Sequence, residues 1–145
     1  MAQLDPGYFR LFDHTADLGM EIYGDDAAAL FANAARALFQ SLVSTGEEQP
    51  AESCRKTIAV TGADWPDLMV NWLRELLYLW NGHQKILIDL HIESLSQTAV
   101  RAQVTAGDFD PRRHTVDQEI KAVTYHQIEA GPHGGRWRAR VIFDI

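Results

Sequence analysis

The segment between Asp64 and Gly82 constrains the fold more than any other part of the sequence, because apolar residues surround most of its helical circumference. These residues are Leu68, Met69, Val70, Trp72, Leu73, Leu76, Leu77, Leu79 and Trp80. Asp64 is the expected N-cap, Pro66 fits the first turn, and Asn81-Gly82 is the expected C-terminal cap. A helix with so little polar surface is either deeply buried in its own domain or partly covered by a partner.

A second helix is predicted from Ala27 to about Val43, because its apolar residues follow the spacing of a single stripe. The stripe consists of Leu30, Phe31, Ala34, Ala35, Leu38, Phe39 and Leu42. The run Gly24-Asp25-Asp26 offers an N-cap aspartate, and the alanines allow the helix to approach a flat surface closely. We therefore expect this helix to pack on a sheet.

Short segments with alternating apolar residues occupy much of the remaining chain and predict strands. They cover residues 8–12, 18–23, 54–61, 86–92, 99–104, 120–126 and 137–143. The predicted order is β-β-α-β-α-β-β-β-β, which indicates a single α+β domain over residues 1–145. We expect a two-layer sandwich, in which a mostly antiparallel sheet carries two helices packed on one face.

The composition narrows the functional classes. A chain of 145 residues with a formal net charge of −7 does not resemble a free-standing nucleic-acid-binding protein, which usually has a basic face. No apolar run reaches the length of a membrane span, about 18 residues, and no signal peptide is evident. Cys54 has no second cysteine with which to pair. These features predict a cytoplasmic protein that meets a basic partner or holds a cation.

The first candidate functional site is Asp13-His14-Thr15-Ala16-Asp17, which links the first two predicted strands. It concentrates two carboxylates, an imidazole and a hydroxyl. A turn needs only one or two polar side chains to bond its backbone, and Asp and Thr commonly do so. The pattern leaves open whether this is an Asx-type turn with a surface histidine or a site for a ligand or metal.

Two further segments are candidates. Asp144 and Ile145 directly follow the last predicted strand and place two anionic groups at its end. The alternative is that the chain simply stops there and these groups form no site. The segment Lys121 to His126 predicts either an edge strand with a solvated face or a functional surface. Common phosphate-binding, thiol, zinc-protease and hydrolase motifs are missing from the sequence. The remaining oxygen-rich residues suit a hard cation such as calcium, magnesium or manganese.

Three parts of the sequence together resemble the archease family: Phe12 to Gly19, Lys121 to His126, and the closing Asp144-Ile145. The resemblance covers essentially the whole chain and implies a small α/β sandwich protein that is not an enzyme. It implies a protein cofactor of the RtcB-type tRNA-splicing RNA ligase, which uses GTP to join a 2′,3′-cyclic phosphate or 3′-phosphate end to a 5′-hydroxyl end. Such a cofactor promotes guanylylation and multiple turnover of the ligase. RNA is expected to be reached only through that partner, and no membrane is expected.

The same resemblance implies a divalent metal ion, with calcium as the first choice and manganese or magnesium as alternatives. Its ligands fall on Asp17, Asp144 and the terminal carboxylate of Ile145. Other matched residues are expected around the metal or on a partner surface, namely Asp13, His14, Lys121, Thr124, Tyr125 and His126. This expectation requires that the loop near residue 17 and the last two residues meet in the fold.

Two other functions remain open on the sequence. A general chaperone or a modulator of nucleic-acid-processing enzymes would have no single partner. A stand-alone metal-dependent hydrolase would use the same carboxylates, and it is disfavoured because no general base of distinctive context accompanies them.

Overall fold

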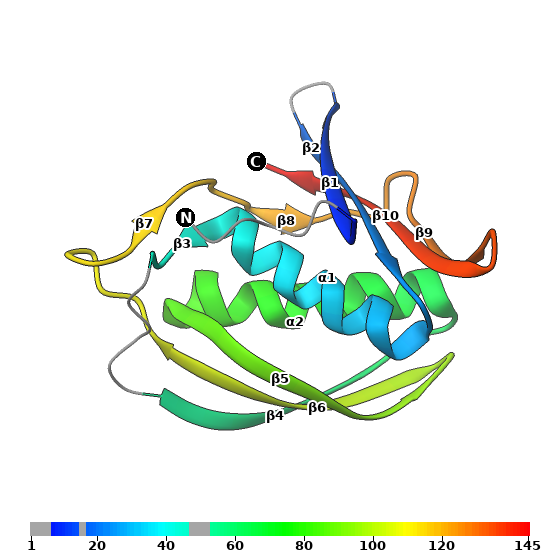
Figure 1. The fold of residues 1–145 in the computed structure, drawn as a ribbon, viewed down its shortest axis with the longest axis horizontal. Helices are drawn as coiled ribbons and strands as arrows, with labels where there is room; N and C mark the ends of the chain where they lie inside the picture. The colour runs from blue at the N-terminus through cyan, green and yellow to red at the C-terminus, as the bar shows by residue number, and fades with distance from the viewer. Residues whose placement is uncertain (1–6, 15–16, 47–52) are drawn as a thin grey trace.

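Two helices lie between two antiparallel sheets in the computed structural model, which describes residues 7–14, 17–46 and 53–145 (Figure 1). Within these ranges, the large sheet has the strand order β1-β2-β10-β8, with β9 also paired to β10, and the small sheet has the order β4-β6-β5. A separate short pairing joins β3 to β7. The strands are β1 (Phe9–His14), β2 (Asp17–Gly24), β3 (Val43–Ser44), β4 (Ser53–Thr61), β5 (Lys85–Ser96), β6 (Ala99–Asp108), β7 (Thr115–Val116), β8 (Ala122–Val123), β9 (Glu129–His133) and β10 (Arg136–Asp144).

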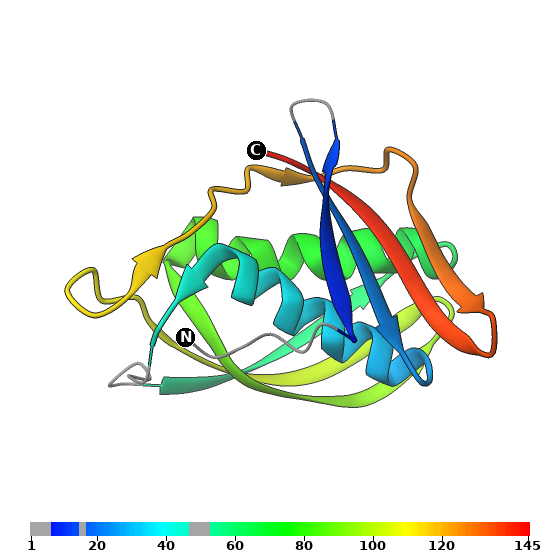
Figure 2. The same ribbon diagram turned by 45° about the horizontal axis from the view of Figure 1, so that its top comes forward.

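The large sheet is built around β10, which pairs with β2 along one side and with β8 and β9 along the other. One face of this sheet is apolar and turns towards the helices, where Met20 and Ile22 of β2 and Val141 and Phe143 of β10 are fully buried. The opposite face carries polar residues, as alternation along a half-buried strand requires. Figure 2 shows β1 and β2 running beside the end of β10, so segments from the start and end of the sequence lie together.

Both helices begin at the aspartate caps expected from the sequence. The Asp26 carboxylate accepts a hydrogen bond from the Ala29 backbone N–H at the start of α1 (Ala27–Leu42). The Asp64 carboxylate does the same for the Asp67 N–H at the start of α2 (Trp65–His83). The second helix continues past the expected Asn81-Gly82 end to His83. Gln84 then adopts the left-handed conformation that ends it.

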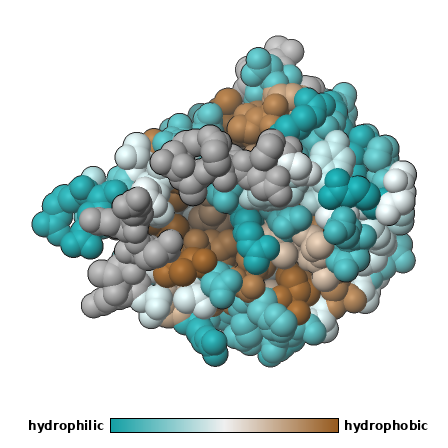
Figure 3. Space-filling model, viewed as in Figure 1, coloured by the Kyte–Doolittle hydropathy of each residue, from teal (hydrophilic) through white to brown (hydrophobic). Residues whose placement is uncertain are grey.

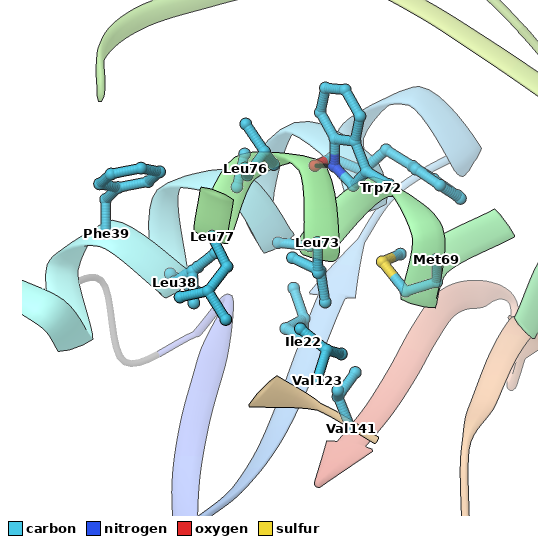
Figure 4. Close-up of a cluster of buried hydrophobic side chains, with 14 of the residues drawn as sticks. Ile22, Leu38, Phe39, Met69, Trp72, Leu73, Leu76, Leu77, Val123 and Val141 are labelled. Carbon is cyan, nitrogen blue, oxygen red and sulfur yellow. Dashed lines mark hydrogen bonds between the residues drawn. The ribbon is translucent and has the colours of Figure 1, made fainter. Parts of the chain in front are cut away.

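The core lies between the two sheets and is centred on α2. Figure 4 shows Leu73 of α2 pointing towards Ile22, Val123 and Val141 of the large sheet. The buried indole of Trp72 donates a 2.9 Å hydrogen bond to the carbonyl oxygen of Phe31, which ties α2 to α1. The apolar circumference of α2 is therefore satisfied within the domain, by α1 and by strands of both sheets.

The α+β class, with two helices and an antiparallel sheet, is confirmed. The layers differ from the expectation of one sheet with the helices on one face, because the strands divide into the large and small sheets and the helices fill the space between them. The strand expected over 120–126 is also much shorter, since only Ala122 and Val123 pair with β10. Among the described residues, no helix is both long and apolar enough to cross a membrane.

Candidate functional site

The two aspartates expected to share a metal ion stand opposite each other in the large sheet. In the antiparallel register of β2 and β10, Asp17 is the direct partner of Asp144. Directly opposed residues in such a pair have Cα atoms about 4.5–5.5 Å apart, and their side chains leave the same face of the sheet. Asp17 is half-buried and Asp144 is exposed. The fold therefore brings together two carboxylates that are distant in the sequence.

The first strand places the other residues of the opening motif. His14 is the register partner of Asp17, while Asp13 is the partner of Leu18. Because successive residues of a strand alternate between faces, Asp13 belongs to the face opposite Asp17, where Leu18 packs against the core. The side chain of His14 and residues 15 and 16 lie outside the described residues.

The segment after residue 120 holds the other side of the β10 end. Ala122 is the register partner of Asp144, and the Lys121 backbone N–H donates a 2.7 Å hydrogen bond to the Asp144 carbonyl oxygen. Thr124 bonds twice to the carbonyl oxygen of Ile142, from its N–H at 3.1 Å and from its hydroxyl at 2.8 Å. The end of β10 is thus fixed between β2 and this segment. The side chains of Lys121 and His126, at the two ends of this segment, are exposed.

Tyr125 lies in the second motif but turns to α2. Its hydroxyl donates a 2.7 Å hydrogen bond to Oδ1 of Asp67, and the guanidinium of Arg74 lies 4.7 Å from the centre of its ring. The hydrogen bond from the Ala63 backbone N–H, followed by the one from Tyr125, lowers the pKa of Asp67. The same bond to Asp67 raises the pKa of Tyr125. Tyr125 is therefore a structural link between the motif and the helix.

A buried carboxylate on the Asp17 face of the large sheet was not foreseen from the sequence. Glu21 is 4% exposed, and its oxygens accept hydrogen bonds from Arg10 at 2.8 Å, Tyr23 at 3.1 Å and Arg140 at 2.6 Å. Burial by itself would raise the pKa of Glu21, but these bonds and the charge of Arg10 bring it below its ordinary value. The alternation of residues 17, 19 and 21 on one face was the available signal, although it does not identify which arginines reach the carboxylate.

Phe12 covers this face between Glu21 and Asp17. The guanidinium carbon of Arg140 lies 4.1 Å from the centre of the Phe12 ring. The ring also lies across Gly19, where an added Cβ would come within 2.2 Å of its carbon atoms. Glycine at this position therefore lets an aromatic ring close over the sheet next to the paired aspartates.

The donor set suits a hard cation but is incomplete if only side chains are counted. The described residues form no group of three or more His, Cys, Asp or Glu side chains able to hold a metal ion. Calcium takes about six to eight oxygen ligands, and main-chain oxygens and water supply many of them in proteins. Asp17 and Asp144 would thus supply two anionic ligands, and the terminal carboxylate of Ile145, the next residue in the chain, is the expected third.

A hollow elsewhere on the molecule is not part of this arrangement. It lies between α1 and the start of β5, has a volume of about 200 Å³ and shows apolar side chains on the face seen in Figure 3. Its walls include Phe39 and Val43 on one side and Ile86 and Leu87 on the other. None of the residues expected in the metal site lines it.

Comparison with known proteins identifies the family of this chain. The model of the Archease protein family (MTH1598/TM1083) matches residues 9–145. The chain belongs to the archease family. Proteins named archease from Methanosarcina mazei and Methanothermobacter thermautotrophicus are 31% and 34% identical to it, over 141 and 143 residues. Each alignment covers 94% of this chain, and 95% and 98% of the respective relative.

Solved structures related to the family share the fold. The solution structure of protein 1598 from Methanobacterium thermoautotrophicum superimposes with a TM-score of 0.72 at 31% identity, covering 94% of this chain and 98% of that one. A crystal structure from Thermotoga maritima, described as an archease and possible chaperone, gives a TM-score of 0.62 at 21% identity, with 94% and 96% covered. The second likeness shows the fold alone.

Proposed function

We propose that this archease-family chain is a protein cofactor of an RtcB-type RNA ligase and holds a divalent cation where β2 meets β10. The proposed ligands are Asp17, Asp144 and the terminal carboxylate of Ile145, and calcium is the first choice of ion, ahead of manganese and magnesium. The observation that carries the proposal is the direct pairing of Asp17 with Asp144 in the register of the large sheet. Membership of the family supports the choice of partner. The proposed compartment is the cytoplasm.

The electrostatics of the pair favour a bound cation. Two unit charges 4 Å apart repel each other by about 1 kcal/mol in water and by about 4 kcal/mol near a protein surface of lower effective dielectric constant. The register of β2 and β10 holds the backbones of Asp17 and Asp144 opposite each other, so both carboxylates start from neighbouring positions on one face of the sheet. A divalent ion turns this repulsion into attraction, and its oxygen preference matches the carboxylates.

The location of the pair suits a role in a partner's reaction. Asp144 and Ile145 are exposed, and the site lies at an end of the large sheet rather than in an enclosed cavity. Guanylylation of a ligase requires divalent metal ions and neutralisation of the GTP phosphates. In the proposal, the end of the large sheet that carries Asp17 and Asp144 docks at the ligase and positions a cation there, or stabilises the ligase conformation that is competent for guanylylation.

The test replaces each paired aspartate by its neutral isostere. Asp17→Asn and Asp144→Asn should lose high-affinity cation binding in calorimetry and should lose stimulation of ligation by a purified RtcB-type ligase. Asp25→Asn is the control, because Asp25 is an exposed aspartate that interacts with Arg136 instead. Full stimulation by both paired-aspartate variants would reject the metal-dependent cofactor role. One residue added after Ile145 should weaken cation binding, because it converts the proposed carboxylate ligand into an amide.

A general chaperone is the alternative, and the description of the Thermotoga maritima structure as a possible chaperone favours testing it. A chaperone should suppress aggregation of several unrelated unfolded proteins, and Asp144→Asn should retain that effect. A cofactor of one ligase should instead act on the ligase alone, with a single dominant partner in affinity capture.

A further inference from the structure

One face of α2 is polar although most of the helix is apolar. Residues 67, 71, 74, 78 and 81 follow one another at intervals of four, three, four and three, so they form a single stripe along the helix. The stripe consists of Asp67, Asn71, Arg74, Tyr78 and Asn81. We call it the α2 polar stripe. Its position explains how a nearly buried helix still presents hydrogen-bonding groups to a neighbouring segment.

The α2 polar stripe binds the segment from Ile120 to Tyr125 at several points. Asn81 donates a 3.0 Å hydrogen bond to the Ile120 carbonyl oxygen. Arg74 donates to the Val123 carbonyl oxygen from Nε at 3.3 Å and from Nη2 at 3.2 Å. These bonds satisfy two carbonyl groups of the segment from the side of α2, while the segment pairs with β10 over Ala122 and Val123.

Tyr125 contacts α2 in two ways, through its hydroxyl and through its ring. Its hydroxyl bonds to Oδ1 of Asp67, while Oδ2 of Asp67 accepts the Ala63 backbone N–H at 2.8 Å. One carboxylate therefore serves both the start of the helix and the tyrosine. The ring of Tyr125 also packs beneath the guanidinium of Arg74, a geometry that favours attraction between the cation and the aromatic face.

The same segment also contacts the end of β10, which carries Asp144 of the proposed cation site. Lys121 and Thr124 donate backbone N–H groups to the carbonyl oxygens of Asp144 and Ile142. Hydrogen bonds thus join the segment to Asp67 at Tyr125 and to the end of β10 at Lys121 and Thr124, and the backbone between these residues connects the two attachments. Ala122 stands opposite Asp144 on one side, and Asp17 stands opposite it on the other.

We propose that Tyr125 is a positioning residue, which anchors the 121–125 segment to α2 and so fixes the end of β10 opposite Asp17. The inference rests on the proposed cation site for its functional meaning, although the anchoring can be measured without the cation. A tyrosine is required rather than a phenylalanine, because the ring alone cannot reach the Asp67 carboxylate with a hydrogen bond. Loosening the anchor should broaden the distribution of Asp144 positions and weaken binding.

The experiment compares Tyr125→Phe with Tyr78→Phe in the full chain. Tyr78 belongs to the same stripe and is 58% exposed, but its ring packs with His83 rather than with the 121–125 segment. Loss of one hydrogen bond to a carboxylate should weaken calcium binding by roughly three- to tenfold in calorimetry at 25 °C. The Tyr78 variant should bind like the native protein. Amide hydrogen exchange at Lys121 and Thr124 should be faster in the Tyr125 variant only.

These two readouts separate positioning from a general effect on stability. An unchanged calcium affinity in Tyr125→Phe, when the native protein binds calcium, would overturn the inference even if the variant melts at a lower temperature. If the native protein binds no cation, the proposed function fails and exchange alone decides the anchoring. Faster exchange at Lys121 and Thr124 then supports it, and unchanged exchange overturns it.

Discussion

Glu21 joins three strands of the large sheet through a single side chain. It lies on β2, and its two arginine partners lie on β1 and β10, one of them 119 residues away in the sequence. Its oxygens are nearly excluded from water, so the arginines and Tyr23 replace the hydration that the carboxylate loses. The charge state of Glu21 therefore contributes to the pairing that aligns Asp17 with Asp144.

Replacing Glu21 by glutamine should destabilise the protein at neutral pH by about 1–3 kcal/mol, because bonds to two charged donors are weakened. The pKa of Glu21 is lowered in the folded state from its ordinary value of 4.5. Its contribution to stability is therefore fully present above the unfolded-state pKa and is lost as the pH falls through the folded-state pKa. The difference between native protein and Glu21→Gln, measured by urea unfolding, should shrink as the pH falls below that ordinary value.

A matched control is Glu129→Gln on the same face. Glu129 bonds to Arg138 at 2.6 Å, but its side chain is 55% exposed, and exposed ion pairs contribute little. We expect a change of less than about 1 kcal/mol that varies weakly with pH. Equal effects of the two substitutions would show that burial does not distinguish Glu21.

The β1–β2 pair depends on the close contact between Phe12 and Gly19. In an open strand, Gly→Ala is often neutral or stabilising, because glycine loses more conformational freedom on folding. Here Gly19→Ala should cost about 1–3 kcal/mol, because the new methyl group overlaps the ring and displaces it from Arg140. Thermal and urea unfolding measure the change.

The double variant Phe12→Ala/Gly19→Ala tests whether the ring is the cause. Without the ring the alanine meets no such obstacle, so the double variant should be more stable than the sum of the single changes predicts. A coupling of about 1 kcal/mol or more is expected for residues in contact. Additive effects would place the cost of Gly19→Ala elsewhere.

Elements with strong internal periodicity were predictable, and those set by distant partners were not. The apolar stripes and aspartate caps located α1 and α2 because the signals lie within a few residues of each other. The segment 120–126 alternates like a strand, but only Ala122 and Val123 pair with β10, and Arg74 and Asn81 of α2 bind the carbonyl groups of Val123 and Ile120. Alternation also cannot tell which strands share a sheet, so the division into large and small sheets was not foreseen.

The neighbouring positions of Asp17 and Asp144 were predictable from the sequence, whereas their role as metal ligands stays a prediction. Family motifs pointed to Asp17 and Asp144, and the register of the large sheet pairs them. The role of Tyr125 depends on Asp67, which lies 58 residues away in the sequence. No local pattern relates those two residues, whereas the polar stripe on an apolar helix was a visible sign that something polar packs there.

For the molecule as a whole, a net charge of −7 and the opposed aspartates predict that the cation alters stability. At a calcium concentration of about one hundred times the dissociation constant, binding should add about 2.7 kcal/mol. For a chain of this size, that corresponds to a rise in melting temperature of roughly 5–10 °C. Calorimetric scans with calcium and with chelator measure the difference.

Asp144→Asn should reverse the order of stabilities between the two conditions. In chelator, the variant should melt slightly above the native protein, because the repulsion with Asp17 is removed. In calcium, it should melt below the native protein, because it gains little from the ion. A variant that tracks the native protein in both conditions would contradict a cation held by this pair, and Asp25→Asn serves as the charge control.

The pairing of Asp17 with Asp144 also has a kinetic consequence, because the two residues are 127 positions apart (144 − 17). Contacts between such distant parts of a chain carry a large loop-closure cost and tend to form late during folding. A cation that requires both carboxylates would therefore not bind the transition state for folding, and it would stabilise only the folded state. Its presence should leave the rate of folding nearly unchanged and lengthen the lifetime of the folded molecule.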